Sequence, residues 1–532
     1  MGEHCVKWML PITRFIVFGF VSVCDLKSTP REPLFKARGM LKSTKHFTPS
    51  SWLGVALLGS VLLLETGCNI GPNYRAPHVT TPAEWATPLA GGETNGPADL
   101  ALWWKSFGDS ELDSLVATAI QSNLTLQVAE SRIRQARAER GIVAAHEGPE
   151  LDAKGSYSRN RFPLNGFPPL PPNAPSDFNL YSARFDASWE IDIFGGTRRA
   201  VEAADAQIMA ARFSRDDVLR SLLGDVAGNY IQARVFQQRL AITRKNIEAQ
   251  QRTVDLTRDQ LRAGLITELH LREAEALLTT TEAQVPSLES GFQIATYRLD
   301  VLLGRMPGQL ATELATESPI PIAPPEVPIG LPSDLLLRRP DIRSAERKLA
   351  AATARIGHAK ADYLPKFSLT GDIGLTSIKA SDWWTAGSRF WSAGPSVVWP
   401  IFESGRIRSN VHLQTAKEQE AFNQYQQSIL VAFEDVSGSL TAYAKEQIRR
   451  RSFSQSVEAN QKALNLAESL YRRGLSDFLH VLNSERGLYQ SQDALVQSDG
   501  FVALNLVELY KALGGGWKDD STPNTEPLAA TR

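Results

Sequence analysis

The chain has 532 residues, of which 43% are hydrophobic, and its formal net charge at pH 7 is −1, which excludes the basic footprint of a nucleic-acid-binding protein. Its three cysteines lack metal-ligand spacing, and this argues against a disulfide framework, a zinc site or a thiol enzyme. The sequence contains no P-loop, HExxH, GxSxG or CxxC motif that would indicate an enzyme.

The first predicted element is an export signal. Lys42 and Lys45 precede an apolar run at residues 52–64. This run is too short to cross a bilayer, which needs about 20 residues, but it is typical of a signal peptide. Residues 1–67 are therefore left out of the fold prediction.

Cys68 follows the small residues Thr66 and Gly67. This stretch resembles a bacterial lipobox, in which the cysteine becomes the lipidated first residue of the mature protein. Glu65 departs from that pattern, so signal cleavage that leaves Cys68 unmodified stays open. Asn69, in place of an aspartate, favours sorting to the outer membrane by the same resemblance.

Four segments alternate apolar and polar side chains with period two, and they predict β-strands. They lie near residues 151–157, 181–193, 367–376 and 391–401. Such segments are typical of a membrane β-barrel, although a half-buried sheet in a soluble protein shows the same pattern. Single-chain barrels start at about eight strands, and lipid does not tolerate open sheet edges. The barrel interpretation therefore requires oligomerisation.

A strand-to-helix junction occurs twice, at an offset of 210 residues. "WEIDIFGGTRR" begins at Trp189 and "WPIFESGRIR" at Trp399, so that Gly195 corresponds to Gly405. "LRAGLITELH" and "YRRGLSDFLH" repeat at the same offset. These matches predict an internal repeat. The first copy is longer by a proline-rich stretch within residues 161–177, which predicts an exposed loop.

The remaining sequence predicts long helices. Helical periodicity covers residues 195–263, 267–303, 406–473 and 477–513. Gly264 and Gly474 end the first helix of each pair, because glycine adopts positive φ readily. An interruption is expected near Pro286, and Pro340 suits the first position of a further helix. A long soluble coiled coil is the alternative, but no strict heptad pattern persists.

The motifs of residues 68–517 resemble those of the outer-membrane efflux lipoproteins, the NodT-type branch of the TolC-like channels. They are "GPNYRAP" after the lipobox, "LPSDLLLRRPDIRSAE", the two junctions, and "YKALGGGW". The resemblance implies a mainly α fold with a membrane β-barrel. In that fold a trimeric β-barrel with four strands per protomer continues into a long periplasmic α-helical barrel.

The resemblance also implies the function. Members of this family are passive exit ducts and not enzymes, and a periplasmic membrane-fusion adaptor docks them to an inner-membrane pump. We expect a homotrimer in the outer membrane that exports small molecules such as drugs with a proton-driven pump of the RND type. We expect no cofactor other than covalent lipid on Cys68, and we expect no nucleic acid as a partner. A duct for type I protein secretion and a structural envelope coiled coil are the alternatives.

The expected organisation has six parts, which the proline-rich linker divides into two halves. They are the N-terminal extension and signal peptide (1–67), a lipid-anchored segment (68–100), the first helix–hairpin–helix repeat (101–310), the equatorial linker (311–332), the second repeat (333–517) and a flexible tail (518–532). Proline removes a backbone donor, so the linker continues neither a helix nor a central strand.

Candidate functional residues lie first at the helix turns. The resemblance assigns the turns to a periplasmic tip that docks the adaptor, through Gly264, Leu265, Gly474, Leu475 and Ser476. Exposed leucines would supply apolar contacts there. Two helix-hairpin turns without any partner are the alternative.

The resemblance also places a periplasmic gate on the helix after the second turn, at His480, Asn483 and Arg486. Asn483 stands where the family commonly has an aspartate, which puts an acidic ring at that level in doubt. A solvated helix face is the alternative. His270 corresponds to His480 in the first copy, and both are interpreted as surface histidines. The alternative is that a trimer brings six histidines near the tip, which could titrate near pH 6–7 or hold a metal.

Glu190 and Asp192 share one strand face and suggest a carboxylate pair for glycoside chemistry. The second copy has Pro400 and Phe402 at these positions. Lining of the lumen or packing at the junction is therefore the preferred interpretation.

Overall fold

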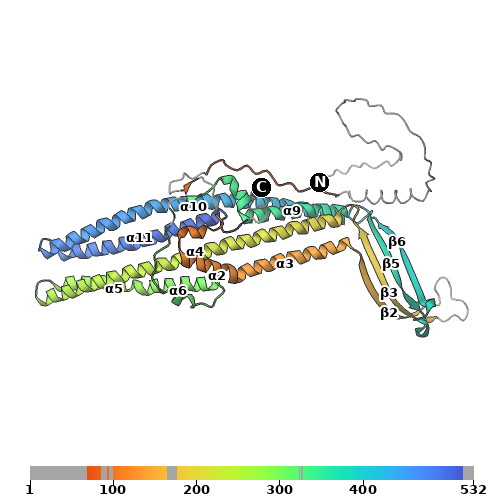
Figure 1. The fold of residues 1–532 in the computed structure, drawn as a ribbon, viewed down its shortest axis with the longest axis horizontal. Helices are drawn as coiled ribbons and strands as arrows, with labels where there is room; N and C mark the ends of the chain where they lie inside the picture. The colour runs from red at the N-terminus through yellow and green to blue at the C-terminus, as the bar shows by residue number, and fades with distance from the viewer. Residues whose placement is uncertain are drawn as a thin grey trace, which may run out of the picture. The chain divides into compact units, whose positions relative to one another are not determined.

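Two helices of 67 residues each, α4 (Gly196–Arg262) and α10 (Arg406–Arg472), dominate the fold (Figure 1). At 1.5 Å per residue each is roughly 100 Å long. The computed structural model describes residues 69–85, 93–94, 100–163, 176–322, 324 and 327–518, all of which belong to the unit Gly67–Arg532. The predicted signal peptide and Cys68 lie outside the described residues.

The shorter helices follow the predicted breaks. They are α2 (Ser110–Ser122), α3 (Leu124–Ala144), α5 (Glu268–Glu282), α6 (Gln284–Leu302), α7 (Leu310–Glu313), α8 (Leu335–Arg338), α9 (Pro340–Ala361) and α11 (Phe478–Ala512). The expected interruption near Pro286 is confirmed as a break at Ala283 between α5 and α6. Pro340 opens α9 as predicted, because the first residue of a helix needs no N–H donor.

The described residues form a four-stranded antiparallel sheet in the order β2–β3–β5–β6. Its strands are β2 (Glu150–Arg161), β3 (Asp177–Ile191), β5 (Lys366–Ser377) and β6 (Arg389–Val398). Strands β3 and β5 come from different copies and pair with Trp189 opposite Leu369. All four strand predictions are confirmed. The pairing leaves β2 and β6 as the edges of this sheet.

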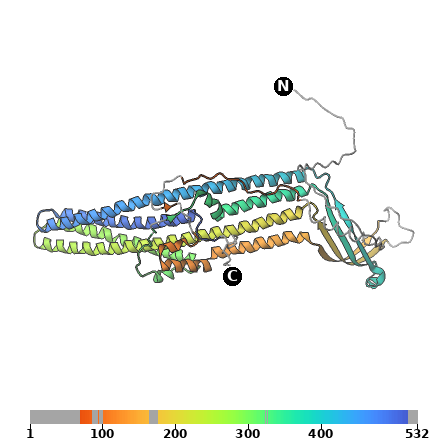
Figure 2. The same ribbon diagram turned by 45° about the horizontal axis from the view of Figure 1, so that its top comes forward.

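The long helices lie side by side in the order α3, α4, α9, α10, with α9 packed against both α4 and α10 (Figures 1 and 2). Beyond this layer, α4 pairs with α5 and α10 pairs with α11, so that each copy ends in a helical hairpin. Helix α11 also packs against α4, and this contact joins the hairpin of one copy to the hairpin of the other.

The main hydrophobic core surrounds the middle of the long helices. Tyr230, Leu223, Tyr443 and Leu299 are among its fully buried side chains. Short elements from distant parts of the chain enclose this core: the 3₁₀ helix η1 (Trp103–Phe107), helix α2, and a parallel pair of β1 (Glu93–Thr94) with β4 (Val327–Pro328). The predicted equatorial linker thus takes part in a layer around the helices.

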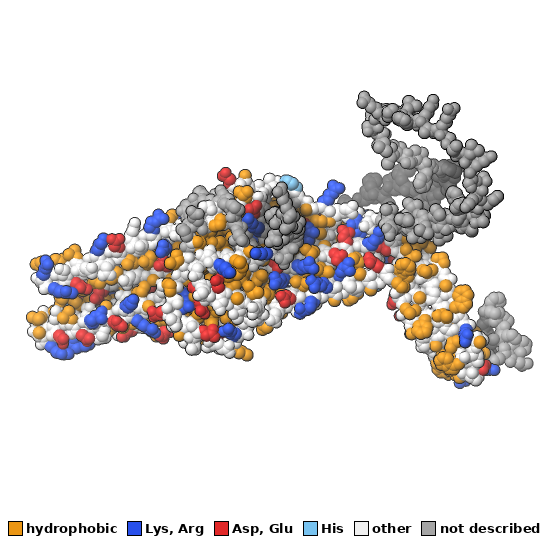
Figure 3. Space-filling model, in the orientation of Figure 1, with side chains coloured by type: hydrophobic (Ala, Val, Ile, Leu, Met, Phe, Trp, Pro, Cys, Tyr) orange, Lys and Arg blue, Asp and Glu red, His pale blue; other side chains and the backbone are white. Residues whose placement is uncertain are grey.

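Large apolar side chains remain exposed on the sheet. Phe185 is 55% exposed, Ile373 61% and Trp391 77%. Hydrophobic side chains cover much of the sheet on the face seen in Figure 3, whereas charged side chains are frequent over the helices. Within the part of the chain that the structure describes, none of the helices is long and apolar enough to cross a membrane.

Candidate functional site

The long helices end in one repeated hydrogen-bonded turn. In the first copy the Leu265 N–H donates to the Gln260 carbonyl at 2.9 Å, and the Gly264 N–H donates to the Leu261 carbonyl at 3.0 Å. The second copy makes both bonds at the positions 210 residues later. This pair of bonds is the Schellman motif, which requires a left-handed residue after the helix. Both glycines have positive φ, as the sequence predicted.

The turns expose the predicted contact residues. Leu265 is 74% exposed and Leu475 is 71% exposed, whereas Ser476 is half-buried. A Cβ added to Gly264 or Gly474 would meet no atom within 4 Å, so neither glycine is held by crowding. In each copy a leucine follows a left-handed backbone position, which glycine adopts without strain. The turn thus presents Leu265 in the first copy and Leu475 in the second to the solvent.

The predicted gate residues share one side of α11. His480, Asn483 and Arg486 are all exposed, whereas Val481 and Leu482 between them are buried. Their spacing of three residues places them on one helix face, one above the other. The structure thus places these three residues on one side of α11, between about one and three helical turns from the tip.

The two histidines differ, although they correspond in sequence. His270 Nδ1 and the Thr267 hydroxyl share a hydrogen bond at 3.0 Å. The His270 Nε2 atom lies 3.4 Å from an Asp477 carboxylate oxygen. His480 is exposed. Both histidines lie at the surface, but His270 is half-buried and contacts a residue of the other copy. No sequence signal points to this contact, since it depends on how the hairpins pack.

The predicted strand–helix junctions are held by one repeated hydrogen bond. The Trp189 indole N–H donates to the Glu147 carbonyl at 2.8 Å, and the Trp399 indole N–H donates to the Tyr363 carbonyl at 3.0 Å. Each bond joins the end of a strand region to the end of the helix that precedes the hairpin. The junction residues therefore position the sheet on the helices.

The junction glycines differ in their surroundings. Gly195 and Gly405 precede α4 and α10 with φ of +78° and +85°. A Cβ at Gly405 would meet nothing within 4 Å, but a Cβ at Gly195 would collide with Asn69. Ile70, the next residue, donates its N–H to the Phe194 carbonyl at 3.2 Å. The segment that follows Cys68 is therefore fixed at the first junction.

The acidic pair Glu190 and Asp192, at the end of β3, takes part in local structure. An Asp192 carboxylate oxygen accepts the backbone N–H of Arg198 at 2.8 Å and lies 3.6 Å from the Arg198 guanidinium. Glu190 is exposed and lies 4.0 Å from Lys366. Asp192 thus stabilises the first turn of α4, where unpaired N–H groups favour an anion. This geometry agrees with junction packing and not with a glycoside-cleaving pair.

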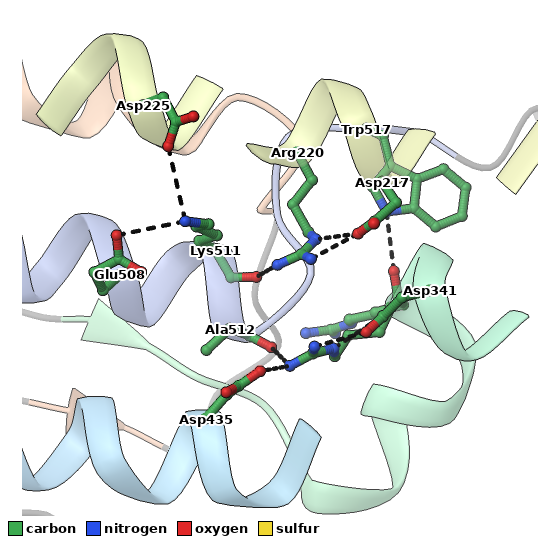
Figure 4. A network of polar contacts seen from close by, with 11 residues as sticks. Asp217, Arg220, Asp225, Asp341, Asp435, Glu508, Lys511, Ala512 and Trp517 are labelled. Carbon is green, nitrogen blue, oxygen red and sulfur yellow. Dashed lines mark hydrogen bonds and ion pairs between the residues drawn. The ribbon is translucent and has the colours of Figure 1, made fainter. Parts of the chain in front are cut away.

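A buried polar network, not assigned from the sequence, lies where α9, α10 and α11 meet (Figure 4). Arg339 is 2% exposed and contacts Asp341 at 2.7 Å, Asp435 of α10 at 2.8 Å and the Ala512 carbonyl of α11 at 3.3 Å. Burial disfavours the charged forms, but these contacts raise the pKa of Arg339, and those with Arg339 lower the pKa of Asp341. The "RRPDIR" motif therefore joins α9, α10 and α11.

The same region fixes the C-terminal end of the described chain. Arg220 of α4 donates to the Lys511 carbonyl at 2.8 Å, and the Trp517 indole N–H donates to the Arg338 carbonyl at 2.9 Å (Figure 4). The motif "YKALGGGW" thus closes against "RRPDIR". Both motifs were visible in the sequence, but only the fold shows that they contact each other.

The comparisons with known proteins agree with this architecture. The sequence model of the family described as "Outer membrane efflux protein" matches residues 115–305 and again residues 331–515. The chain belongs to the outer membrane efflux protein family.

Relatives and solved structures agree over most of the chain. Nodulation protein T of Rhizobium leguminosarum bv. trifolii is 32% identical over 86% of this chain and 96% of that protein. The toluene efflux pump outer membrane protein TtgI of Pseudomonas putida is also 32% identical, over 86% and 97%. The structure of the outer-membrane channel OprN has a TM-score of 0.79 and 35% identity, and the match covers 85% of this chain and 100% of OprN.

These findings confirm the predicted fold class, function and location. The efflux protein has the mainly helical fold with membrane strands of the TolC-like outer-membrane channels, and it is an outer-membrane transport duct that extends into the periplasm. It belongs to a family of ducts and is not an enzyme. The domain boundaries and the roles of the tip, gate and lipidation residues stay predictions.

Proposed function

We propose that three copies of this efflux protein form one channel, with twelve strands in the outer membrane and a helical barrel below. The observation that carries the proposal is the open sheet. Strands β2 and β6 end it, and it exposes Phe185, Ile373 and Trp391. Lipid accepts an apolar sheet face but not unpaired strand edges. Copies of the same sheet can pair these edges with one another in a closed ring.

Exposed apolar side chains on the helices support the same assembly. Ile294 and Val301 on α6 are 65% and 53% exposed, and Leu430 and Leu466 on α10 are 65% and 60% exposed. In the described chain α6 packs mainly on α4, and α10 mainly on α9 and α11, so these faces have no helix of the same protomer over them. A neighbouring copy would bury them.

We further propose that Cys68 carries lipid. Asn69 and Ile70 are held at the junction between β3 and α4, which is the level at which the sheet ends. A lipid on Cys68, the residue before Asn69, would therefore reach the membrane surface without a linker segment. A second anchor beside membrane strands adds hydrophobic burial of about 0.8 kcal/mol per CH₂. We propose no other cofactor.

The exposed tips are proposed to dock a periplasmic adaptor protein, which couples the channel to a proton-driven inner-membrane pump of the RND type. Leu265 and Leu475 supply two apolar contacts per protomer, and Gly474 with Ser476 shapes the second turn. His480, Asn483 and Arg486 would form polar rings of a gate just inside, if α11 turns this face to the pore. The proposed cargo is small molecules, in keeping with the toluene efflux named for one relative.

Two experiments test this proposal. Cross-linking of the full chain in outer-membrane fractions should yield a trimer, and a monomer alone would contradict the assembly. For docking, Leu475→Asp should weaken cross-linking to the co-expressed adaptor while trimers persist, and Gln455→Asp, at an exposed polar position on α10, serves as the comparison away from the tip. Unchanged adaptor cross-linking in Leu475→Asp would refute the tip contact.

The gate assignment has its own test in planar bilayers. Asn483→Asp adds three negative charges to a trimeric ring, so cation selectivity should rise. Arg486→Ala removes three positive charges and should increase the closed-state conductance. If both variants conduct like the parent channel, the gate lies elsewhere.

A further inference from the structure

Three titratable side chains lie where the hairpin of the first copy meets helix α11, and we call this contact the tip seam. His270 of α5 and Thr253 of α4 stand on one side of it. Asp477, which precedes α11, and Glu485 within α11 stand on the other. The seam pairs His270 with Asp477 at 3.4 Å, and Thr253 donates a hydrogen bond to Glu485 at 2.9 Å.

Glu485 differs from its counterpart in the first copy. That counterpart, Glu275, contacts the guanidinium groups of Arg272 at 2.9 Å and Arg258 at 3.5 Å. The residues of the second copy at these two positions are Leu482 and Glu468. The repeat therefore replaces two cations by a leucine and a second carboxylate. Glu485 carries a buried carboxylate oxygen that has no hydrogen-bond partner among the described residues.

Glu485 accepts its hydrogen bond from a neutral hydroxyl, that of Thr253, and not from a cation. It lines a cavity of about 950 Å³ at the tip together with Arg252 of α4 and with Glu468 and Arg472 of α10. Arg472 is already paired with Glu468 at 3.0 Å. Burial raises the pKa of Glu485, the Thr253 hydrogen bond lowers it, and the nearby Glu468 charge raises it again, with a net increase.

His270 faces one charged group across the seam. That group is Asp477, and the ring also lies 6.1 Å from the Phe478 ring. The contact with His270 lowers the pKa of Asp477, so the aspartate stays ionised when the imidazole gains a proton. On its own helix, the neighbouring Glu268 and Arg272 are paired with each other at 2.9 Å.

We propose that the tip seam is a proton-operated latch, in which protonation of His270 and Glu485 tightens the packing of the first hairpin against α11. Protonated His270 forms an ion pair with Asp477. Protonated Glu485 no longer keeps a half-buried charge whose direct contact is a neutral hydroxyl, which is a costly arrangement for a carboxylate.

Protonation of His270 and protonation of Glu485 both favour the packed seam. A group whose pKa is higher in the packed seam than in the opened seam stabilises the packed seam at low pH, and this contribution is lost as pH rises through the raised pKa. Glu485 fits this description, because burial raises its pKa, and the Asp477 carboxylate lies against the His270 ring, which favours the imidazolium form. The latch needs only the two hairpins of one protomer, so it stands whether or not the trimer and the adaptor are as proposed.

Hydrogen–deuterium exchange of the full chain in detergent tests the latch. Peptides that cover residues 265–282 and 477–490 should exchange more slowly at about pH 5.5 than at about pH 8 after correction for intrinsic rates. One unit of pKa difference corresponds to about a tenfold change in the opening equilibrium. Glu485→Gln should protect the seam at both pH values, since the amide imitates the neutral acid.

The variants separate the latch from a general structural effect. His270→Asn should remove part of the pH response, Asp477→Asn should remove the same part, and His270→Asn with Glu485→Gln should abolish it. His412→Asn, an exposed histidine on α10, should keep the full response. A parent chain whose seam exchanges equally at both pH values, or a double variant that responds like the parent, would overturn the proposal.

Discussion

The indole nitrogen of Trp189 and the carbonyl oxygen of Glu147 lie 2.8 Å apart, and Trp399 repeats this bond with Tyr363 at 3.0 Å. The tryptophans are 210 residues apart, but their partners are 216 apart, because the first hairpin is six residues longer. The extra residues therefore lie between the two ends of the bond and leave the junction unchanged. This repeated bond is the basis of the first prediction.

Replacement of Trp399 by Phe should destabilise the protein by about 1 kcal/mol, because the ring is kept and one hydrogen bond is lost. Trp189→Phe should have a similar effect, since the bond is the same. The measurement is the midpoint of denaturant unfolding in detergent. Trp391→Phe is the matched control, because Trp391 is 77% exposed. Equal midpoints for all three variants would show that the junction bond contributes nothing.

Arg339→Ala should be among the most destabilising single changes in the helical part. It leaves Asp341 and Asp435 without their shared cation, and loss of one partner from a buried pair typically costs about 3–5 kcal/mol. Thermal unfolding is the measurement. The neighbouring Arg338→Ala is the control, because Arg338 is more exposed and its contact with Asp334 is 3.4 Å. A loss as small as that of Arg338→Ala would contradict the role of the network.

The stability of the protein should fall in acid through Asp341. Its pKa is lower in the folded state than its ordinary value, because the contacts with Arg339 outweigh burial. A carboxyl of this kind stabilises the fold above its ordinary pKa of about 4, and the contribution is lost as pH falls below that value.

Denaturant unfolding between about pH 3 and pH 7 measures this effect against Asp341→Asn. The variant should be less stable than the parent at neutral pH, and the gap should narrow below about pH 4. A gap that stays constant over the whole range would mean that Asp341 does not titrate with folding.

Gly195→Ala should be worse than Gly405→Ala, although both glycines have positive φ. An L residue in this region costs about 1–2 kcal/mol at either position. Only Gly195 is also crowded by Asn69, so its replacement must displace the segment after Cys68. Unfolding midpoints and protease susceptibility of residues 69–85 provide the comparison. Equal losses at both positions would show that Asn69 yields without cost.

Much of the fold was accessible from the sequence because its signals are local. The strands follow from period-two alternation, and the helix ends from Gly264 and Gly474, whose positive φ is a property of the residue itself. The tip leucines were assigned by the family resemblance, which places those turns at the periplasmic tip. The offset between the copies also identified Trp189 and Trp399 as corresponding positions, although it gave no hint of their hydrogen-bond partners.

Other features could not be predicted because they join residues far apart in the chain. The Arg339 network needs α9, α10 and α11 in place, and the contact of His270 with Asp477 needs two hairpins packed together. His270 and His480 are equivalent by sequence and differ only in their neighbours. The same holds for Glu275 and Glu485, because the charges around a carboxylate depend on the helix that packs opposite it.

The sequence by itself determined the elements and their twofold repetition, since periodicity and turn residues act over a few positions, and its motifs indicated the efflux family by resemblance. Only the tertiary structure decided which copies of a repeated residue are buried, paired or exposed. The physical reason is that burial and ion pairing depend on the element packed opposite, and the two copies pack against different neighbours.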